Sequence, residues 1–439
     1  MLEFINKYVL GAAVPTLIFF LGGFFLIYLR LFYLKHPIKV LKSILKPNKE
    51  KGSSPFSAMT VALAGTLGVG NIVGVSSAVI LGGIGSLFWM IVSAFFSMVL
   101  KYSEVVLAVK HRRYENGRPF GGAMYYIEDT VKGKRGKGLA KLFSLLIVVT
   151  SISMGGMLQS RAVGDSFYQL FGISPYIIGA ILTLLVAAVI FGSFRNISSV
   201  TSIIIPFFSV VYLVMCVYVL IVCRDSLGTA LRRILYDAFS FGSVGGGIFG
   251  FLISGGVRYG AMRGLLSNEA GCGTAPTAHA STNATSAEEQ GIWGILEVFI
   301  DTVLLCTLTG LVIAVNIAPS SIGGYRGKEI ELVFDSFSSV LGDFSSYFLA
   351  ISIFFFAFST IICWGYYGLE ALKYVTINRK FPRIYKLLYI ILVFIAVDNC
   401  HDLIWDISDM ALGIMTLINL SILYRERKKI RAATSLIKK

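Results

Sequence analysis

The sequence predicts an all-α integral membrane protein of about eleven transmembrane helices. Of its 439 residues, 56% are hydrophobic and only 14% are charged, whereas a soluble domain is about 25% charged. The apolar residues gather in runs of about 20 residues, the length that crosses a bilayer. Because so apolar a chain cannot bury its surface in a water-soluble core, the composition excludes a cytosolic enzyme, a secreted disulfide module and a disordered chain.

Eleven candidate spans follow one another along the chain. No small-residue cleavage site follows the first, so we expect it to remain as a helix. No linker is long enough to separate domains, so residues 1–439 are expected to form one membrane unit. The spans are residues 8–34, 57–83, 86–109, 142–170, 175–193, 200–223, 242–266, 291–317, 345–372, 384–398 and 403–424.

The charge distribution predicts an orientation. The net charge is +15, and basic residues gather in the loops 35–51, 110–141 and 373–386 and in the tail 425–439. With eleven spans and an outside N-terminus, all four segments fall on the cytoplasmic side, as the positive-inside rule requires. We therefore expect a multi-pass protein of the cell (plasma or inner) membrane with a cytoplasmic C-terminus. The lipid bilayer, and not nucleic acid, is its expected partner.

The second span departs most clearly from a lipid-facing helix. Residues 64–74 read Ala-Gly-Thr-Leu-Gly-Val-Gly-Asn-Ile-Val-Gly, and each glycine weakens a helix by about 1 kcal/mol relative to alanine. An interrupted helix frees N–H groups that suit a carboxylate. It also frees carbonyls that, with Thr66 and Asn71, suit a small cation such as Na⁺. Close helix packing is the alternative; it accounts for the glycines but not for Asn71.

The seventh span also combines glycines with polar residues. It runs into Ser267-Asn268-Glu269-Ala270-Gly271, which is either a capped helix end or a second interruption. Two interrupted spans, five spans apart, indicate an inverted-repeat transporter. Glycines spaced four apart predict close helix contact along this span. These glycines are Gly242, Gly246, Gly250, Gly256, Gly260 and Gly264.

Polar residues in other spans are further candidates. Gln159 is a mid-membrane amide. The hydroxyls of Ser359 and Thr360 either complete a cation shell or bond to carbonyls one turn earlier, and Trp364 shares the face of Thr360. In-span charges are expected to pair along their own helices. The carboxylates of Glu297 and Asp301, four residues apart, either relay protons or hold a cation, or they partner Arg258, Arg263 or backbone amides at a helix end, and the second interpretation is the one we expect. The expected pairs are Arg161 with Asp165 and Lys101 with Glu104.

Several ordered motifs together resemble the sodium:alanine (alanine or glycine:cation) symporter family. They lie in order between about residues 55 and 420, and no catalytic motif accompanies them. The motifs are residues 64–74, Leu81-Gly-Gly-Ile-Gly85, Phe88-Trp89-Met90, residues 101–110, Gly121-Gly-Ala-Met-Tyr-Tyr-Ile-Glu128, Ser267-Asn-Glu-Ala-Gly271, Ala275-Pro276, Gly294-Ile-Leu-Glu-Val-Phe-Ile-Asp-Thr302, residues 357–368 and Asp402-Leu-Ile-Trp405.

The resemblance implies the leucine-transporter-like fold. One extra span, residues 8–34, would precede two five-helix inverted repeats, residues 55–223 and 240–424, and the basic tail 425–439 would follow. It also implies cotransport of a small neutral amino acid with Na⁺ as the coupling ion and no organic cofactor. The implied substrate contacts are Gly68, Gly70, Gln159, Leu266, Asn268, Thr360 and Trp364, and the implied Na⁺ ligands are Ala64, Thr66, Leu67, Asn71, Ser359 and Thr360.

Three positions depart from the family pattern. The family usually has Phe where Leu266 stands, Asn where Gly156 stands and Ser where Gly365 stands. Since a removed ring leaves room for a larger ligand, we hypothesise a substrate bulkier than alanine.

Other functions stay open at this point. Proton-coupled transport of the same substrates is one alternative to Na⁺ symport. A cation channel, or an amino-acid sensor that does not translocate its ligand, is an alternative of another class. The sequence does not indicate an oligomeric state.

Overall fold

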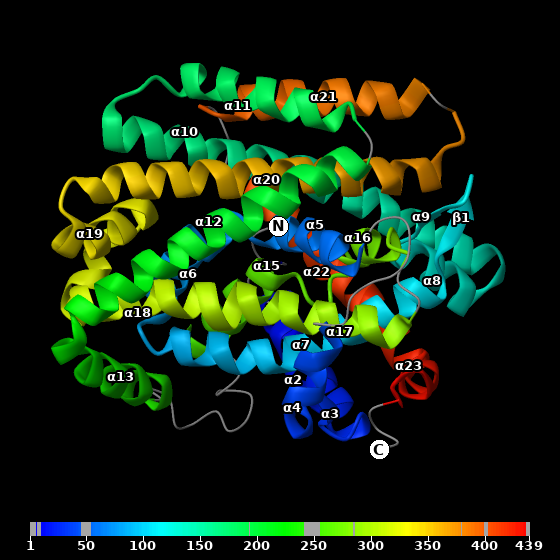
Figure 1. The fold of residues 1–439 in the computed structure, drawn as a ribbon, viewed down its shortest axis with the longest axis horizontal. Coiled ribbons are helices and arrows are strands. Elements are labelled where there is room, and N and C mark those ends of the chain that lie inside the picture. Colours follow the sequence, from blue (N-terminus) through cyan, green and yellow to red (C-terminus); the bar gives the residue numbers. More distant parts are fainter. Residues whose placement is uncertain are drawn as a thin grey trace.

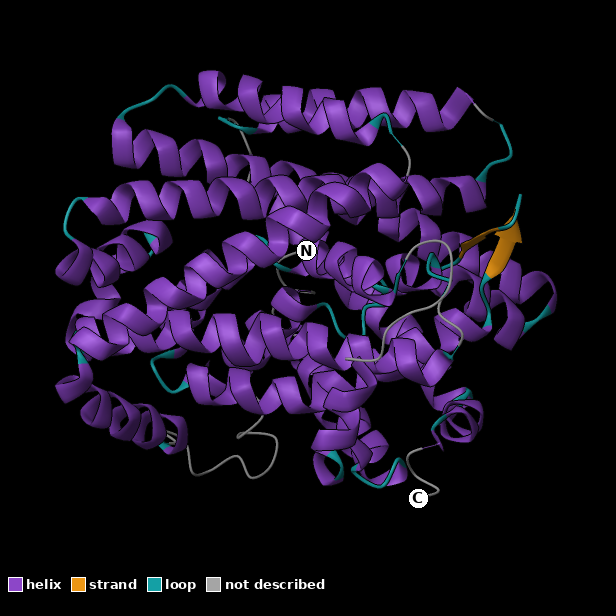
Figure 2. Ribbon diagram, viewed as in Figure 1, coloured by secondary structure: helices purple, strands orange, loops and turns teal. Residues whose placement is uncertain are grey.

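The computed structural model describes residues 6, 10–44, 54–192, 194–240, 255–283, 286–378, 380–398 and 403–435, which are helical nearly throughout (Figures 1 and 2). The first half of the described chain contains α2 (Gly11–Tyr28), α3 (Phe32–Lys35), α4 (Pro37–Ile44), α5 (Pro55–Thr66), α6 (Val73–Gly82), α7 (Ser86–Lys110), α8 (Ala123–Val131), α9 (Gly133–Thr150), α10 (Leu158–Phe171), α11 (Pro175–Ile190), α12 (Phe194–Val222) and α13 (Arg224–Phe239).

The second half continues the same pattern. Its helices are α15 (Gly255–Asn268), α16 (Pro276–Ala280), α17 (Ala287–Val298), α18 (Thr307–Asn316), α19 (Glu329–Leu341), α20 (Phe344–Val375), α21 (Lys380–Ala396), α22 (Leu403–Arg425) and α23 (Arg427–Ala433). Short 3₁₀ segments lie at Val69–Asn71 and Pro319–Tyr325, and π-helical segments at Ser151–Met157 and Phe299–Cys306.

Every predicted span contains at least one of these helices. For the seventh span only the part from residue 255 onward is described, so Gly242, Gly246 and Gly250 lie outside the described residues. Within the described ranges, six helices are long and apolar enough to cross a membrane. They are Ser86–Lys110, Gly133–Phe171, Phe194–Val222, Ala287–Asn316, Phe344–Val375 and Leu403–Arg425. The membrane class is therefore supported directly, and the count of eleven stays a prediction.

The long helix α20 organises the bundle (Figure 1). It contacts α10, α11 and α21 along one side and α5 and α12 along another. Helix α7 packs against α2, α15 and α17, so α5 and α15 occupy the middle of the molecule. The two segments predicted to be interrupted are therefore surrounded by other helices, where irregular backbone is tolerated at membrane depth.

The glycines at the described end of the seventh span allow α15 to approach α7 closely. A Cβ at Gly260 would collide with the backbone of Ser86, and one at Gly264 would lie 2.9 Å from Ser93 Oγ. The prediction of close contact through these small residues is confirmed.

The basic loop after α7 contains a short β-hairpin. Strands β1 (Arg113–Glu115) and β2 (Arg118–Phe120) pair antiparallel and are the strands in Figure 2. Asn116 and Gly117 between them have φ values of 49° and 72°, as expected for the tight Asn-Gly hairpin turn. That dipeptide is a recognisable signal for the hairpin.

Candidate functional site

The chain leaves the helix in the middle of the second span, as predicted. Helix α5 ends at Thr66, Gly68 is extended (φ −108°, ψ −154°), a 3₁₀ turn follows at Val69–Asn71, and α6 begins at Val73. A helix end leaves N–H and C=O groups without intrahelical partners. The first interruption, residues 67–72, therefore presents backbone polar groups inside an apolar bundle.

Gly68 brings three helices together at this interruption. A Cβ at Gly68 would lie 2.8 Å from Gln159 Oε1 on α10 and 2.8 Å from Thr360 Oγ1 on α20. The N–H of Val69 donates to Gln159 Oε1 at 3.0 Å, and Thr360 Oγ1 donates to the carbonyl of Ala64 at 2.8 Å. Four residues selected from the sequence, from three segments that are far apart in the chain, therefore meet at one point.

The seventh span ends in a second interruption, residues 269–275. Helix α15 ends at Asn268, and α16 begins only at Pro276. Between them Glu269, Gly271 and Gly273 have positive φ values of 52°, 89° and 77°, which an α-helix does not contain. Of the two alternatives drawn from the sequence, the interruption is the one observed.

Asn268 holds this second interruption in place. Its Nδ2 donates to Thr302 Oγ1 at 3.0 Å, and its Oδ1 accepts the N–H of Ala270 at 3.0 Å. Both groups of the amide are thus used by the protein itself, so in this conformation Asn268 supports the backbone.

Trp364 connects the second interruption to α20. The indole is fully buried, and its Nε1–H donates to Glu269 Oε1 at 3.1 Å. A side chain at Gly155, in the π-helical segment before α10, would collide with Trp364. The bulky ring therefore fits because its neighbour is glycine.

Asn71 joins the first interruption to the end of α15 and to the π-helical segment Phe299–Cys306. Its Nδ2 is 2.7 Å from Asp301 Oδ1 and 3.1 Å from Ser267 Oγ. Ser267 and Thr302 also donate to the Asp301 carboxylate, at 2.9 and 2.7 Å. The Oδ1 of Asn71 is buried and has no hydrogen-bond partner among the described residues, so it remains available as an acceptor or ligand.

Two further hydroxyls predicted to bind a cation belong to Thr66 and Ser359. Thr66 Oγ1 donates to the carbonyl of Leu63 at 3.2 Å, and Ser359 Oγ donates to that of Phe356 at 2.8 Å. Both hydroxyls therefore bond back to their own helices, and their oxygens still carry lone pairs that can coordinate. Leu67 directly follows the last residue of α5. Gly70 faces the last turn of α15, since a Cβ there would lie 3.8 Å from Ser267 Cα.

The three departures from the family pattern do not surround Gln159 and Thr360. A Cβ at Gly156 would lie 3.2 Å from the ring of Tyr389 on α21, and one at Gly365 would collide with Ile190 on α11. Both positions therefore face neighbouring helices. The hypothesis that these changes enlarge the substrate site is therefore not supported at these two positions and stays a prediction.

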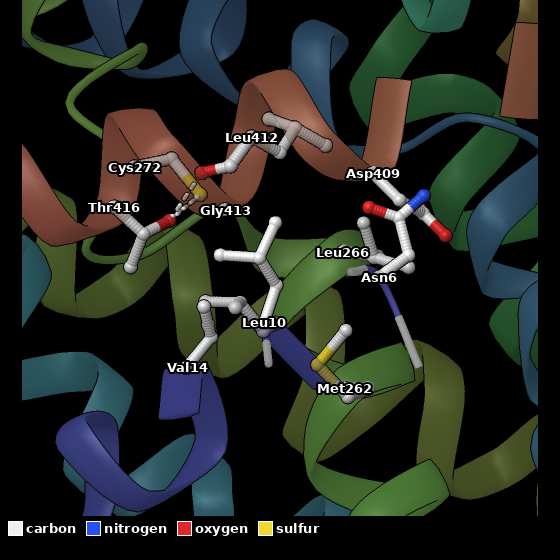
Figure 3. Close-up of a pocket in the computed structure, with 11 residues that line it drawn as sticks. Asn6, Leu10, Val14, Met262, Leu266, Cys272, Asp409, Leu412, Gly413 and Thr416 are labelled. Atoms are coloured by element: carbon white, nitrogen blue, oxygen red, sulfur yellow. Dashed lines mark hydrogen bonds between the residues drawn. The ribbon is translucent and has the colours of Figure 1, made fainter. Parts of the chain in front are cut away.

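Leu266 lines a small cavity elsewhere (Figure 3). This cavity of about 30 Å³ lies between α2, α15 and α22, with Leu10, Val14, Cys272 and Thr416 among its lining residues. It has room for one or two water molecules, and the other predicted substrate contacts do not line it. We predicted from the resemblance that Leu266 forms a wall of the substrate site. This arrangement does not support that role, which stays a prediction.

Two of the three interpretations of in-span charges need correction. Arg161 and Asp165 pair at 2.8 Å as predicted. Lys101, however, pairs with Glu297 on α17 at 3.1 Å and not with Glu104. Glu104 lies about one turn away on the same helix as Lys101, but the carboxylate that pairs with Lys101 is that of Glu297 on a neighbouring helix.

The buried carboxylates also have partners other than those expected. Glu104 accepts the N–H of Gly273 at 2.9 Å and a hydrogen bond from Asn419, so it supports the second interruption. Glu297 accepts from Lys101 and His279, and Asp301 from Asn71. None of these bonds involves Arg258 or Arg263, because the partners lie on helices that only the fold brings close.

Interrupted helices that face each other inside an apolar bundle define a class of membrane transporters. The chain belongs to the sodium:alanine symporter family, whose sequence profile matches residues 1–436. This confirms the resemblance drawn from the motifs, and it makes the chain a transporter and not an enzyme.

Curated relatives agree with this assignment. The sodium/alanine symporter AgcS of Methanococcus maripaludis is 34% identical over 95% of this chain and 92% of its own length. The probable sodium/glutamine symporter GlnT of Bacillus subtilis is 30% identical over 90% of this chain and 80% of its own.

A solved structure shares the fold. The crystal structure of MhsT in complex with L-phenylalanine aligns with a TM-score of 0.60 and 14% identity, over 88% of this chain and 93% of that one. The leucine-transporter-like fold is thereby confirmed as the overall fold.

Proposed function

We propose that the protein is a secondary transporter that couples the inward flow of Na⁺ to the uptake of a small neutral amino acid by alternating access. The meeting of Gly68, Gln159 and Thr360 at the first interruption carries this proposal. Membership of the sodium:alanine symporter family and the relative named as a sodium/alanine symporter support it.

The substrate carboxylate would bind to the freed N–H groups around Gly68 and Gly70, because N–H groups at the start of a helical segment favour negative charge. The amide of Gln159, now bonded to Val69, would exchange that bond for one to the substrate. Thr360 and Trp364 would form the opposite wall, with Asn268 beside it. Since Gly156 and Gly365 face other helices, we propose an alanine- or glycine-sized substrate over a bulkier one.

Na⁺ would be held by oxygen atoms of the first interruption and α20. The carbonyls of Ala64 and Leu67 with the hydroxyls of Ser359 and Thr360 form one oxygen set, since Thr360 already contacts Ala64. The unpartnered Oδ1 of Asn71, with Thr66, forms a second, and the neighbouring Asp301 adds negative charge. Neutral and anionic oxygens suit a hard cation.

The proposed architecture has eleven spans. The span formed by α2 precedes two inverted repeats, residues 55–223 and 240–424, each of which begins with an interrupted helix. The N-terminus would face outside, and the loops 35–51, 110–141 and 373–386 and the tail 425–439 would be cytoplasmic, as their basic residues favour.

Uptake of labelled alanine by the reconstituted protein tests the proposal. An inward Na⁺ gradient should drive accumulation above the equilibrium level, and replacement of Na⁺ by choline should abolish it. Accumulation that survives in choline but collapses with an uncoupler would instead show proton coupling. Equilibration without accumulation would indicate a channel, and binding without uptake a sensor.

A further inference from the structure

Helix α13 lies across one end of the bundle, between the end of α12 and the start of α7 (Figure 1). Both α12 and α7 are long and apolar enough to cross a membrane. Helix α13 begins two residues after α12 ends. At its other end, Asp237 Oδ2 accepts the N–H of Gly85, directly before α7, at 2.7 Å. Trp89 Nε1 on α7 donates to the carbonyl of Ala238 at 3.0 Å. Because α13 joins the ends of two spanning helices, it lies near the level of the membrane surface.

One face of α13 attaches the helix to the protein. Ala230, Ile234 and Ala238 are spaced four apart and are buried, and α13 packs on α7 and α18. Residues four apart share one face of a helix. The side chains on the other faces of α13 therefore point away from this contact.

A second face of α13 is apolar and exposed. Leu231, Leu235 and Phe239 are also spaced four apart, and they are 44%, 50% and 51% exposed. The ring of Phe239 lies against Phe88 and Trp89, with centroids 5.1 and 5.8 Å apart, and Trp is enriched where hydrocarbon meets headgroups. Contact with water is unfavourable for this apolar stripe, whereas the acyl chains of a bilayer would cover it.

Two exposed arginines, Arg232 and Arg233, border the apolar stripe. Arg232 comes three residues before Leu235 and so lies beside it on the helix. Neither arginine forms an ion pair within the part of the chain that the structure describes, and Asp237 is turned toward Gly85. The guanidinium groups are therefore available to an outside anion, and their planar set of donors matches a phosphate group.

We propose that α13 binds an anionic phospholipid, whose acyl chains cover the apolar stripe and whose phosphate group is held by Arg232 and Arg233. This is the arrangement of an amphipathic helix that lies in a membrane interface. A soluble anion would leave the apolar stripe in water, and a second copy of α13 would bring arginines against arginines. A phospholipid satisfies both halves of the surface. The proposal depends neither on the leaflet that this end of the bundle faces nor on the transported substrate.

Mass spectrometry of the intact full-length protein, released from detergent, tests the proposal because it counts bound lipid molecules during a titration. Phosphatidylglycerol is compared with phosphatidylcholine of the same acyl chains, and the wild type should bind phosphatidylglycerol more tightly. The double variant Arg232→Gln/Arg233→Gln should bind phosphatidylglycerol about tenfold or more weakly, since each basic residue at an anionic membrane surface adds to the attraction. Its binding of phosphatidylcholine should be unchanged.

The matched control is Lys134→Gln/Arg135→Gln at the start of α9. It also replaces two adjacent, exposed basic residues, but no apolar stripe of α13 lies beside them, so binding should equal that of the wild type. Equal affinity of the wild type for the two lipids, or equal weakening in both double variants, would overturn the proposal.

The apolar half of the surface has its own test. Leu231→Ser/Leu235→Ser should also weaken binding of phosphatidylglycerol, and unchanged binding would contradict the proposed contact with acyl chains. Glycerol phosphate, the soluble headgroup, should not displace the lipid; displacement would indicate a site for a free phosphate compound instead. A protein dimer that the arginine variant separates would indicate that a second copy covers α13. Since no uptake is measured, a failure of Na⁺ symport would leave this result intact, and the reverse also holds.

Discussion

The hydroxyl of Thr360 donates to the carbonyl oxygen of Ala64 at 2.8 Å and so joins α20 to the last turn of α5. The same hydroxyl stands against Gly68. One side chain therefore touches both the proposed cation ligands and the backbone proposed to bind the substrate. Under the proposed function, this contact would make binding of the ion and of the amino acid depend on each other.

Replacing Thr360 by Val should lower Na⁺-driven uptake about tenfold or more, because the variant keeps the shape and loses the hydroxyl. A buried carbonyl left without its donor costs about 1–3 kcal/mol, and 1.4 kcal/mol is a factor of ten. Thr360→Ser keeps the hydroxyl and should retain most uptake. Equal uptake by the Val and Ser variants would remove Thr360 from the site.

Gly68→Ala should abolish most uptake while the protein still folds. The added methyl group would lie 2.8 Å from both Gln159 Oε1 and Thr360 Oγ1, so the two side chains must separate. Gly74→Ala is the matched control, since a Cβ there meets nothing within 4 Å and alanine favours the helix by about 1 kcal/mol. If both variants transport normally, the first interruption is not the binding site.

Lys101→Met should destabilise the protein by about 3–5 kcal/mol, because it leaves Glu297 buried without its ammonium partner. The double variant with Glu297→Gln should recover much of this loss. Lys373→Met removes a surface pair with Glu370 and should change stability by less than about 1 kcal/mol. Unfolding in detergent checks the series, and a Lys101→Met effect as small as that of Lys373→Met would contradict the buried pair.

Much of the site could be predicted from the sequence because its signals are local. Glycines and Asn71 in the middle of an apolar run predict an interrupted helix, whatever the position of that helix in the bundle. Ser-Asn-Glu-Ala-Gly marked the second one with an alternative left open, which the backbone of Glu269 decides. The contact of Gln159 with Val69, across 90 positions, depended on the family resemblance.

The remaining features depend on how each helix is rotated in the bundle. Lys101 has Glu104 nearby in sequence but Glu297 nearby in space, and only the packing of α7 on α17 reveals the second. Gly156 lies in a π-helical segment, whose wider turn shifts the register that an ideal helix would give. Its distance from Gln159 in sequence therefore does not say which neighbour it faces.

The Leu266→Phe variant tests whether Leu266 faces the cavity or the substrate site. Because Leu266 lines the cavity between α2 and α22, the larger ring should leave the order of competing amino acids unchanged in an uptake panel. It should lower stability instead, because the ring needs more room than this cavity of about 30 Å³ offers, and overpacking typically costs about 1–3 kcal/mol. A narrowed preference for the smallest amino acids in this variant would return Leu266 to the substrate site.

The central claim is that the two interruptions bind an amino acid and Na⁺ together. Equilibrium binding of labelled alanine to the purified protein, measured as Na⁺ replaces choline at constant ionic strength, tests it most directly. We predict that Na⁺ raises the affinity for alanine tenfold or more, and that Asn71→Ala requires a higher Na⁺ concentration for the same gain. Alanine affinity that is the same in Na⁺ and in choline would contradict the account.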